Sequence, residues 1–234
     1  PVDKNTAIAT IGTRVYKTTD GGASWQPSNT GHQGFAFGRG ALPGLYFDPS
    51  DPKKMWTFNY DFGTVATSDN WDTAERLTGM SLPSPSWGSH QLGGTVLPTG
   101  RIFAIGGTYY NHVICKKDPG NPWQALTTTY TYTTTASMID VSSAPYIETI
   151  QLHSNGTTIY VSNIRSDDGG NSWAKMADGS YHILGMYKKN CNIIYAARYT
   201  QSSERTNTRI IYKSTDKGNT WTALPEAPMR VGFS

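Results

Sequence analysis

The stretch "KTTDGGASW", residues 17–25, decides the fold: an Asp and two Gly residues lie between a Thr pair and a Trp. The same arrangement returns as "SDDGGNSW" (166–173) and "STDKGNTW" (214–221), and in weaker form as "KKDPGNPW" (116–123). A fifth copy, "TSDNWDTA" (67–74), keeps the Asp but has lost the Gly and the Trp at the matching places. We call these five segments the repeat turns. A catalytic acid is normally unique, so this recurrence favours a structural role for the Asp.

The repeat turns recur with a regular period, because the acids lie 48 to 50 residues apart, at Asp20, Asp69, Asp118, Asp168 and Asp216. Four copies place a Trp five residues after the Asp, namely Trp25, Trp123, Trp173 and Trp221. Each copy follows a strand-like run and precedes a shorter one, which predicts a hairpin turn. In such a turn Asp, Ser and Thr side chains accept hydrogen bonds from backbone amides, Gly allows positive φ, and the Trp ring fills space between hairpins.

The pattern resembles the Asp-box, or bacterial neuraminidase repeat, with the consensus Ser/Thr-x-Asp-x-Gly-x-Ser/Thr-Trp. The copies at 18–25, 166–173 and 214–221 match it fully, and the copy at 116–123 keeps Asp, Gly and Trp. The copy at 67–74 keeps Thr67, Asp69 and Thr73, so we expect replacement of Asp69 to destabilise the fold least. The resemblance spans sialidases, two-propeller xyloglucanases, sortilin-type receptors and photosystem assembly factors. It therefore implies a class of repeat rather than one activity.

Repeats of this length, each with three or four short antiparallel strands, predict an all-β fold, a β-propeller of five blades of about 49 residues over residues 1–234. The 24 Gly, 13 Pro and 16% charged residues fit many short strands and turns. The first repeat lacks an inner strand, and the final "MRVGFS" resembles "QGFAFGRG" (33–40), which precedes an inner strand. Two alternatives stay open: a closed five-bladed ring, or an arc that further blades or a partner chain complete.

Several classes of partner are not expected. The net charge of +3 is small and scattered, so we expect no nucleic acid, and no apolar run is long enough for a membrane span. The sequence as given has no signal-peptide pattern, but it starts at Pro1 rather than Met, which leaves open that processing or truncation has removed one. The five His residues are scattered without paired spacing and no Gly-rich phosphate loop occurs, so we predict no metal and no cofactor.

Two local features have structural interpretations. Cys115 and Cys191 belong to non-adjacent repeats, so we expect two buried free thiols rather than a disulfide. The sequence "NGT" at 155–157 matches a glycosylation sequon, but Asn-Gly between two strand-like runs favours a tight hairpin turn.

Catalytic signals are weak. A sialidase would need several Arg, an Asp and a Tyr activated by Glu, but the Arg-Ile-Pro signature of that family is missing, since "GRIF" (100–103) has Phe where Pro is expected. A xyloglucanase-type enzyme would use two carboxylates across an open cleft. Asp61 and Asp140 are the candidates, because neither belongs to a repeat turn; each is also interpretable as an ordinary turn or strand-end acid.

The long connections carry the best binding candidates. Trp87, His90, Tyr109 and Tyr110 could stack on sugar rings or anchor a partner protein, whereas Trp87 could equally pack under its own Pro-rich loop. We therefore expect a non-catalytic module that binds a glycan or a protein in an extracellular, secreted or virion-surface assembly. The alternative is a glycoside hydrolase, xyloglucanase-like before sialidase-like, or part of one.

Overall fold

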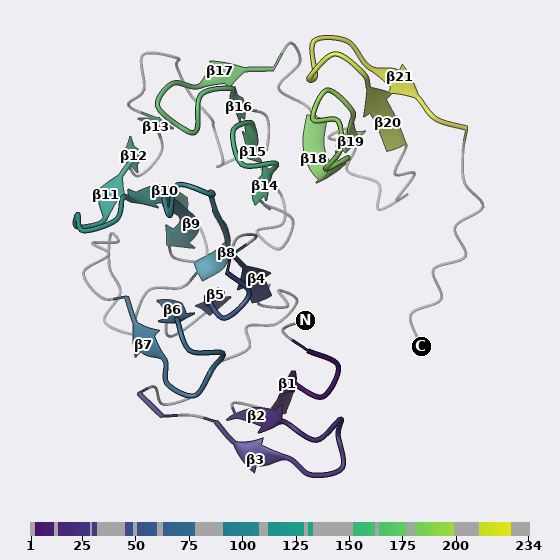
Figure 1. Cartoon of the computed structure of the whole chain (residues 1–234). Coiled ribbons are helices and arrows are strands. Elements are labelled where there is room, and N and C mark those ends of the chain that lie inside the picture. Colours follow the sequence, from purple (N-terminus) through teal and green to yellow (C-terminus); the bar gives the residue numbers. More distant parts are fainter. Residues whose placement is uncertain are drawn as a thin grey trace, which may run out of the picture. The chain divides into compact units, whose positions relative to one another are not determined.

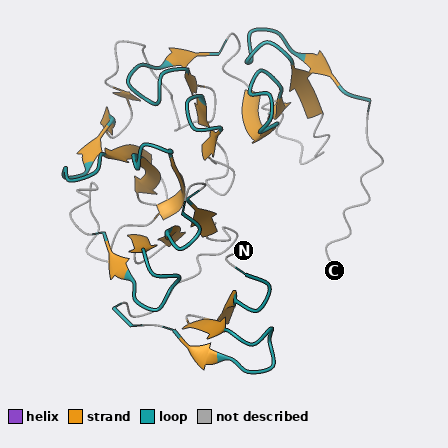
Figure 2. Cartoon of the chain, viewed as in Figure 1, coloured by secondary structure: helices purple, strands orange, loops and turns teal. Residues whose placement is uncertain are grey.

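The computed structural model describes residues 3–11, 14–28, 30–31, 45–48, 51–59, 63–77, 91–107, 112–128, 131–132, 152–161, 164–176, 181–198 and 211–225. The regular secondary structure in these ranges consists of β-strands alone (Figure 2), which confirms the all-β prediction. The strands are short, and most are bounded by the Gly-, Pro- and Asp-containing turns that the sequence predicts.

Consecutive strands form five small sheets, which we number I to V in chain order, and one two-stranded hairpin (Figure 1). Sheet I contains β1 (Ala7–Ile11), β2 (Arg14–Thr18) and β3 (Gln26–Pro27). Sheet II contains β4 (Leu45–Phe47), β5 (Met55–Asn59), β6 (Gly63–Thr67) and β7 (Glu75–Arg76). Sheet III contains β8 (Gln91–Val96), β9 (Ile102–Gly107), β10 (His112–Lys117) and β11 (Gln124–Ala125).

The hairpin of β12 (Thr127–Thr128) and β13 (Thr131–Tyr132) follows sheet III. Sheet IV contains β14 (Leu152–Ser154), β15 (Ile159–Val161), β16 (Ile164–Ser166) and β17 (Ala174–Lys175). Sheet V contains β18 (Tyr181–Met186), β19 (Ile194–Arg198), β20 (Ile211–Ser214) and β21 (Thr222–Ala223).

Among the described residues, sheet I has three strands, whereas each of the other four sheets has four. In sheet II, Thr67, which lies two residues before the Asp of its repeat turn, pairs with Met55 of the second strand. In sheet I the matching Thr18 pairs with Ala7, so β1 corresponds to the second strand, β5. The described residues contain no counterpart of β4 in sheet I, as the sequence predicts for the first repeat.

The chain divides into two compact units, Pro1–Leu152 and His153–Ser234, and each is described by itself. In the first unit, apolar side chains fill the space between successive sheets. Val15 and Ile8 of sheet I pack against Met55, Val65 and the ring of Trp71 from sheet II. The alternating positions of sheet II face the other way, where they pack on sheet III through a cluster of Tyr46, Trp56, Phe58, Leu77, Val96, Ile102, Ala104, Cys115 and Trp123.

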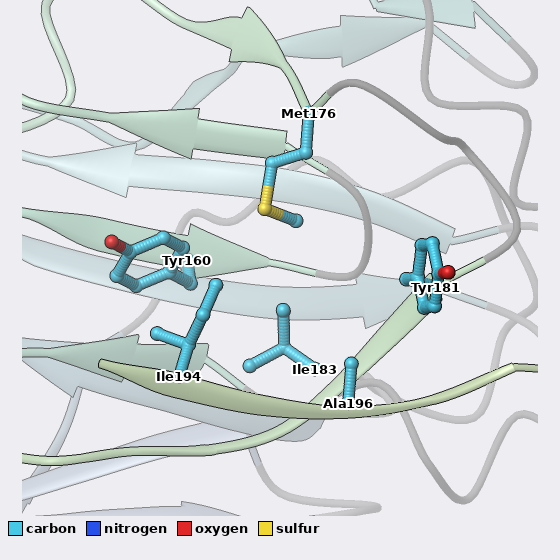
Figure 3. Packing of buried hydrophobic residues seen from close by; sticks show 6 residues of the cluster. All are labelled: Tyr160, Met176, Tyr181, Ile183, Ile194 and Ala196. Carbon is cyan, nitrogen blue, oxygen red and sulfur yellow. The ribbon is translucent and has the colours of Figure 1, made fainter. Parts of the chain in front are cut away.

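In the second unit the same arrangement joins sheets IV and V. Tyr160 and Met176 of sheet IV pack against Tyr181, Ile183 and Ile194 of sheet V (Figure 3). The Tyr181 ring stacks on the indole of Trp221, with ring centroids 4.6 Å apart. The repeat-turn Trp of sheet V therefore lies on the face that packs against the preceding sheet.

Two glycines allow these close approaches. A Cβ atom at Gly94 would lie 2.2 Å from the Phe58 ring, and one at Gly218 would lie 2.5 Å from the sulfur of Met176. Gly218 also has a φ of +85°, which an L side chain rarely adopts. Sheet packing in both units thus depends on positions that have no side chain.

The prediction of a hairpin turn at 155–157 agrees with the structure, and the prediction of two buried free thiols agrees except for the burial of Cys191. Both cysteines are free thiols; Cys115 is buried, as expected, whereas Cys191 is only half-buried. Residues 155–157 form the turn between β14 and β15, where Gly156 has a φ of 103°. The Asn155 side-chain oxygen accepts a hydrogen bond from the backbone N–H of Thr158, at 2.9 Å.

Candidate functional site

The repeat turn of sheet IV shows how its acid is used. One carboxylate oxygen of Asp168 accepts hydrogen bonds from the hydroxyl of Ser166 (2.8 Å) and the N–H of Ser172 (2.9 Å), and the other accepts from the hydroxyl of Ser172 (2.6 Å). The Ser166 hydroxyl oxygen accepts from the N–H of Gly170 (2.7 Å). The carboxylate therefore ties the two ends of the turn together.

The turns of sheets I and V repeat this arrangement. Asp20 accepts from the N–H and hydroxyl of Ser24, and Asp216 accepts from the N–H and hydroxyl of Thr220, at 2.6 to 2.9 Å. The hydrogen bonds from Thr220 and Ser214 lower the pKa of Asp216 to about 2. Partial burial raises the pKa of Asp168, but the bonds from Ser172 and Ser166 outweigh it and lower that pKa to about 2.

The turn of sheet II keeps the hydrogen bonds although its sequence is degraded. Asp69 accepts from the N–H of Thr73 (2.9 Å) and from the hydroxyl of Thr67 (2.8 Å). Asn70 and Trp71 have φ values of 59° and 69°, the conformation that Gly21 and Gly22 adopt in sheet I, and Trp71 is 1% exposed. This turn therefore still has a buried indole, at a different position of the turn. The missing consensus Trp is then no reason to expect that replacing Asp69 destabilises the fold least.

The turn of sheet III is built differently. Lys116 pairs with Gln124, so this turn is one residue shorter than that of sheet V, where Lys213 pairs with Thr222. Asp118 has no Ser or Thr at the two hydroxyl positions of the motif, and instead its carboxylate lies 2.5 Å from Nε of Arg101. The Arg101 guanidinium lowers the pKa of Asp118. A charge pair therefore replaces the hydroxyl partners here.

In four of the five sheets, a further hydrogen bond links the repeat turn to the segment just before the second strand, which in sheet I is the segment just before β1. The residue after the Asp donates its backbone N–H to a carbonyl there, 2.8 to 3.0 Å away, in the pairs Gly21 to Asn5, Asn70 to Lys53, Gly169 to Thr157 and Lys217 to Asn192. In sheet III this residue is Pro119, which has no N–H. Arg101, which follows the corresponding turn, makes the connection through Asp118 instead.

A charged network joins sheets IV and V beside their repeat turns. Lys217 Nζ lies 2.8 Å from the carboxylate of Asp167, and Arg165 Nε lies 2.9 Å from it. The Arg165 guanidinium also donates to the backbone carbonyl of Lys217 at 2.5 Å. Asp167 thus bridges a cation of sheet IV and a cation of sheet V. The sequence did not indicate this structural role, because the repeat pattern pointed to the neighbouring Asp168 instead.

All six residues proposed for catalysis or binding lie outside the described residues, in connections that leave the ends of described strands. They are Asp61, Asp140, Trp87, His90, Tyr109 and Tyr110. The flanking strands of two of these connections are described: β5 ends and β6 begins around 60–62, and β9 ends and β10 begins around 108–111. Each connection starts at the end of its hairpin opposite to the repeat turn.

The repeat pattern predicts that the Trp25 ring is buried like the other tryptophans at this place in the motif, but the ring is exposed. Trp25 is 41% exposed, whereas Trp123 is 8% and Trp173 is 5% exposed. In sheet III the corresponding indole packs against sheet II, but the described residues include no sheet that precedes sheet I. Phe47 at the end of β4 is 52% exposed in the same unit.

Within the described ranges, no group of three or more His, Cys, Asp or Glu side chains is placed to hold a metal ion. The same part of the chain has no helix whose length and apolarity would let it cross a membrane.

Solved structures with similar folds include enzymes and a peptide-binding protein. An ancestral GH74 enzyme matches with a TM-score of 0.63 at 17% identity over 96% of this chain and 30% of its own. The GH74 xyloglucanase from Xanthomonas campestris has a TM-score of 0.56 at 14% identity, covering 96% of this chain and 37% of its own. YCF48 bound to a D1 peptide has a TM-score of 0.50 at 13% identity, covering 94% and 63%.

No family model and no curated protein sequence matches the chain. The chain spans about a third of the length of the two GH74 enzymes and less than two thirds of YCF48. At these identities the likeness concerns the fold alone, and its antiparallel sheets of sequential strands agree with it. The chain has a β-propeller fold, one that occurs both in GH74 enzymes and in YCF48.

Proposed function

We propose that this chain is an Asp-box propeller that binds a protein or glycan ligand without catalysing a reaction, in an extracellular, secreted or virion-surface assembly. The observation that carries the proposal is how the repeat-turn acids are used. Hydrogen bonds within their own turns hold Asp168 and Asp216 at a pKa of about 2. The pKa of the other three acids is lowered as well. A general acid works with a pKa near the operating pH, so these five acids serve the turns rather than general acid catalysis.

A protein ligand, like a glycan, is compatible with the fold. YCF48, a propeller of similar fold, has been solved with a D1 peptide. Loops at the ends of β-hairpins are where rigid β folds carry recognition residues. We place the ligand at the connections opposite to the repeat turns, with Trp87, His90, Tyr109 and Tyr110 as its contacts.

The experiment combines binding and turnover on one preparation. The purified chain is applied to an array of β-glucans, xyloglucan oligosaccharides and sialosides, and reducing ends are measured in parallel. We expect retention without release of reducing ends, and at least a tenfold loss of binding in Trp87→Ala and Tyr109→Ala. A matched variant on the opposite end of the hairpins, Lys53→Ala, should bind normally. Release of reducing ends would contradict the proposal.

A glycoside hydrolase, or part of one, is the second candidate, because both GH74 matches cover 96% of this chain. Asp61 and Asp140 are then the acid and base, acting on a β-glucan chain. The variants Asp61→Asn and Asp140→Asn separate the two proposals: each would abolish hydrolysis of xyloglucan if the chain is an enzyme. Absence of hydrolysis by the unsubstituted chain would remove this candidate.

A further inference from the structure

The turn between β14 and β15 contains the one Asn-Gly pair of the sequence, Asn155 and Gly156. Asn is among the chemically labile residues of proteins, because the backbone nitrogen of the next residue can attack its side-chain carbonyl. A Gly in that next position has no Cβ atom and leaves its nitrogen open to this approach. Asn155 is exposed and Gly156 is half-buried, so solvent reaches the pair.

The hydrogen bonds of this turn assist such an attack. The Oδ1 atom of Asn155 accepts from the backbone N–H groups of Thr157 (3.2 Å) and Thr158 (2.9 Å). These two donors polarise the side-chain carbonyl and stabilise the negative charge that develops on its oxygen during the attack. The N–H of Gly156 donates to the Ser154 hydroxyl oxygen at 2.9 Å. The proton that the nitrogen must lose is therefore already directed at an acceptor.

Two Asn residues in the repeat turns of sheets IV and V are held differently. Asn171 and Asn219 are exposed like Asn155, but the side-chain nitrogen of each donates to the backbone carbonyl of the acid in its own turn, at 2.7 and 2.8 Å. The backbone N–H that follows each of them donates to the carboxylate of that acid. Among the described residues, no hydrogen bond holds the side-chain nitrogen of Asn155. The two repeat turns therefore hold both reacting groups, whereas this turn leaves the departing nitrogen free.

We propose that Asn155 is a site of spontaneous covalent modification in the folded protein, promoted by the hydrogen bonds of its own turn and independent of the ligand proposed above. The Gly156 nitrogen bonds to Cγ of Asn155 and the Cγ–Nδ2 bond breaks. Nδ2 leaves as ammonia, and the proton that it gains balances the one that the Gly156 nitrogen loses. Water then opens the succinimide ring. Addition of water at Cγ gives Asp, whereas addition at the backbone carbonyl carbon gives isoaspartate, in which the main chain runs through Cβ and Cγ.

The isoaspartate product disturbs a contact of the repeat turn in sheet IV. The Thr157 carbonyl accepts the backbone N–H of Gly169 at 2.9 Å, which connects the modified turn to that repeat turn. An additional main-chain atom before Gly156 displaces Thr157, whereas conversion to Asp leaves the main chain unchanged. We therefore expect the isoaspartate fraction to have a lower thermal midpoint than the unmodified chain. The variant Asn155→Asp carries the same charge and should keep the original midpoint.

The experiment follows the unsubstituted chain with time at physiological temperature and mildly alkaline pH, where circular dichroism verifies that it stays folded. Released ammonia is measured, peptide mapping by mass spectrometry locates each modified Asn, and labelling by isoaspartyl methyltransferase identifies isoaspartate. We expect Asn155 to be converted at least about tenfold faster than Asn171 and Asn219 in the same molecules. Conversion should accelerate with rising pH, because the Gly156 nitrogen must lose a proton. Equal rates at the three residues, or no conversion of Asn155, overturns the proposal.

Three variants test the part that the turn plays, and the comparison within the unsubstituted chain stands even if one of them fails to fold. Ser154→Ala removes the acceptor of the Gly156 proton and should slow conversion at least about threefold. Asn155→Gln should abolish it. The matched control is Thr157→Ser, which keeps the backbone N–H that Asn155 accepts and should react at the original rate. An unchanged rate in folded Ser154→Ala overturns the proposed role of the turn, and an isoaspartate fraction of unchanged midpoint overturns the proposed loss of the Gly169 contact.

Discussion

At the residue scale, the acid of a repeat turn acts through the hydrogen bonds that it accepts, and the consensus around it can vary as long as these bonds remain. Asp69 has neither Gly nor Trp at the usual places but accepts the same bonds from Thr67 and Thr73 as Asp168 does from Ser166 and Ser172. A positive φ at Asn70 and Trp71 replaces the conformational freedom of two glycines. The bonding pattern, rather than the match to the consensus, therefore determines what each acid contributes.

Replacing a turn acid should lower stability by a similar amount in sheets II and IV. Each carboxylate accepts several bonds, but Asp168 is exposed and Asp69 is only half-buried. We therefore expect Asp168→Ala and Asp69→Ala each to lower the unfolding free energy by about 1 to 2 kcal/mol. Denaturant midpoints at constant m-value measure this. A much smaller loss in Asp69→Ala would support the ranking based on consensus. Binding per folded molecule should stay the same.

Acid should destabilise the protein through these same groups. The pKa of Asp168 and of Asp216 is lowered from its ordinary value of 3.8 to about 2 in the folded state. The stabilisation is therefore present above about pH 4 and is lost as the pH falls toward 2, because the unfolded chain takes up the protons first. We expect the denaturation midpoint to fall over this interval. The double variant Asp168→Asn and Asp216→Asn should show a shallower fall.

At the scale of strands and turns, repeat turns are connected to their own sheets, and the turn of sheet V also contacts the preceding sheet. In sheets I, II, IV and V the N–H that follows the Asp donates to a carbonyl just before the strand that pairs with the one preceding the repeat turn. In sheet III the Arg101–Asp118 pair replaces this bond, because Pro119 cannot donate. In the second unit, Gly218 lets the turn of sheet V approach Met176 of sheet IV. A turn is thus also part of a sheet-to-sheet contact.

Two alanine substitutions separate these roles. Gly120 (φ +75°) and Gly218 (φ +85°) share a left-handed conformation, but a Cβ atom at Gly120 meets nothing within 4 Å, whereas one at Gly218 meets the Met176 sulfur. We expect Gly120→Ala to destabilise by about 1 to 2 kcal/mol through backbone strain alone. Gly218→Ala should exceed this by about 1 to 3 kcal/mol through overpacking. Equal losses in thermal or denaturant unfolding would show that Met176 moves aside at no cost.

At the scale of the whole molecule, stability comes from apolar faces buried between successive sheets within each unit. Sheet II has one face on sheet I and the other on sheet III, so its alternating residues are apolar on both sides. Among the described residues, sheet II covers one face of sheet I and no sheet covers the other, and Trp25 is 41% exposed. The same residue type at the same place in the motif therefore contributes differently according to what lies next to the sheet.

The matched pair of tryptophans in the first unit tests this difference. Trp123→Ala removes a ring that is 8% exposed and packed between two sheets, so we expect a loss of about 3 to 5 kcal/mol in unfolding free energy. Trp25→Ala removes a ring that is 41% exposed and should cost less than about 1 kcal/mol for the isolated chain. Urea unfolding followed by circular dichroism measures both. Comparable losses would mean that Trp25 is covered in solution.

The sequence by itself determined the local structure: the all-β class, the repeat turns and the hairpin at 155–157. These follow from short-range chemistry, since a carboxylate, a hydroxyl and residues with positive φ a few positions apart form the same turn wherever they occur. The sequence also predicted that the described part of sheet I contains no counterpart of β4. It did not reveal Arg101 as the partner of Asp118 or Asp167 as a bridge between sheets, because those pairs join residues 17 and 50 positions apart. Nor could it separate Trp25 from Trp123. The motif is local and identical at both, whereas burial depends on whether a neighbouring sheet covers the ring, which only the tertiary structure decides.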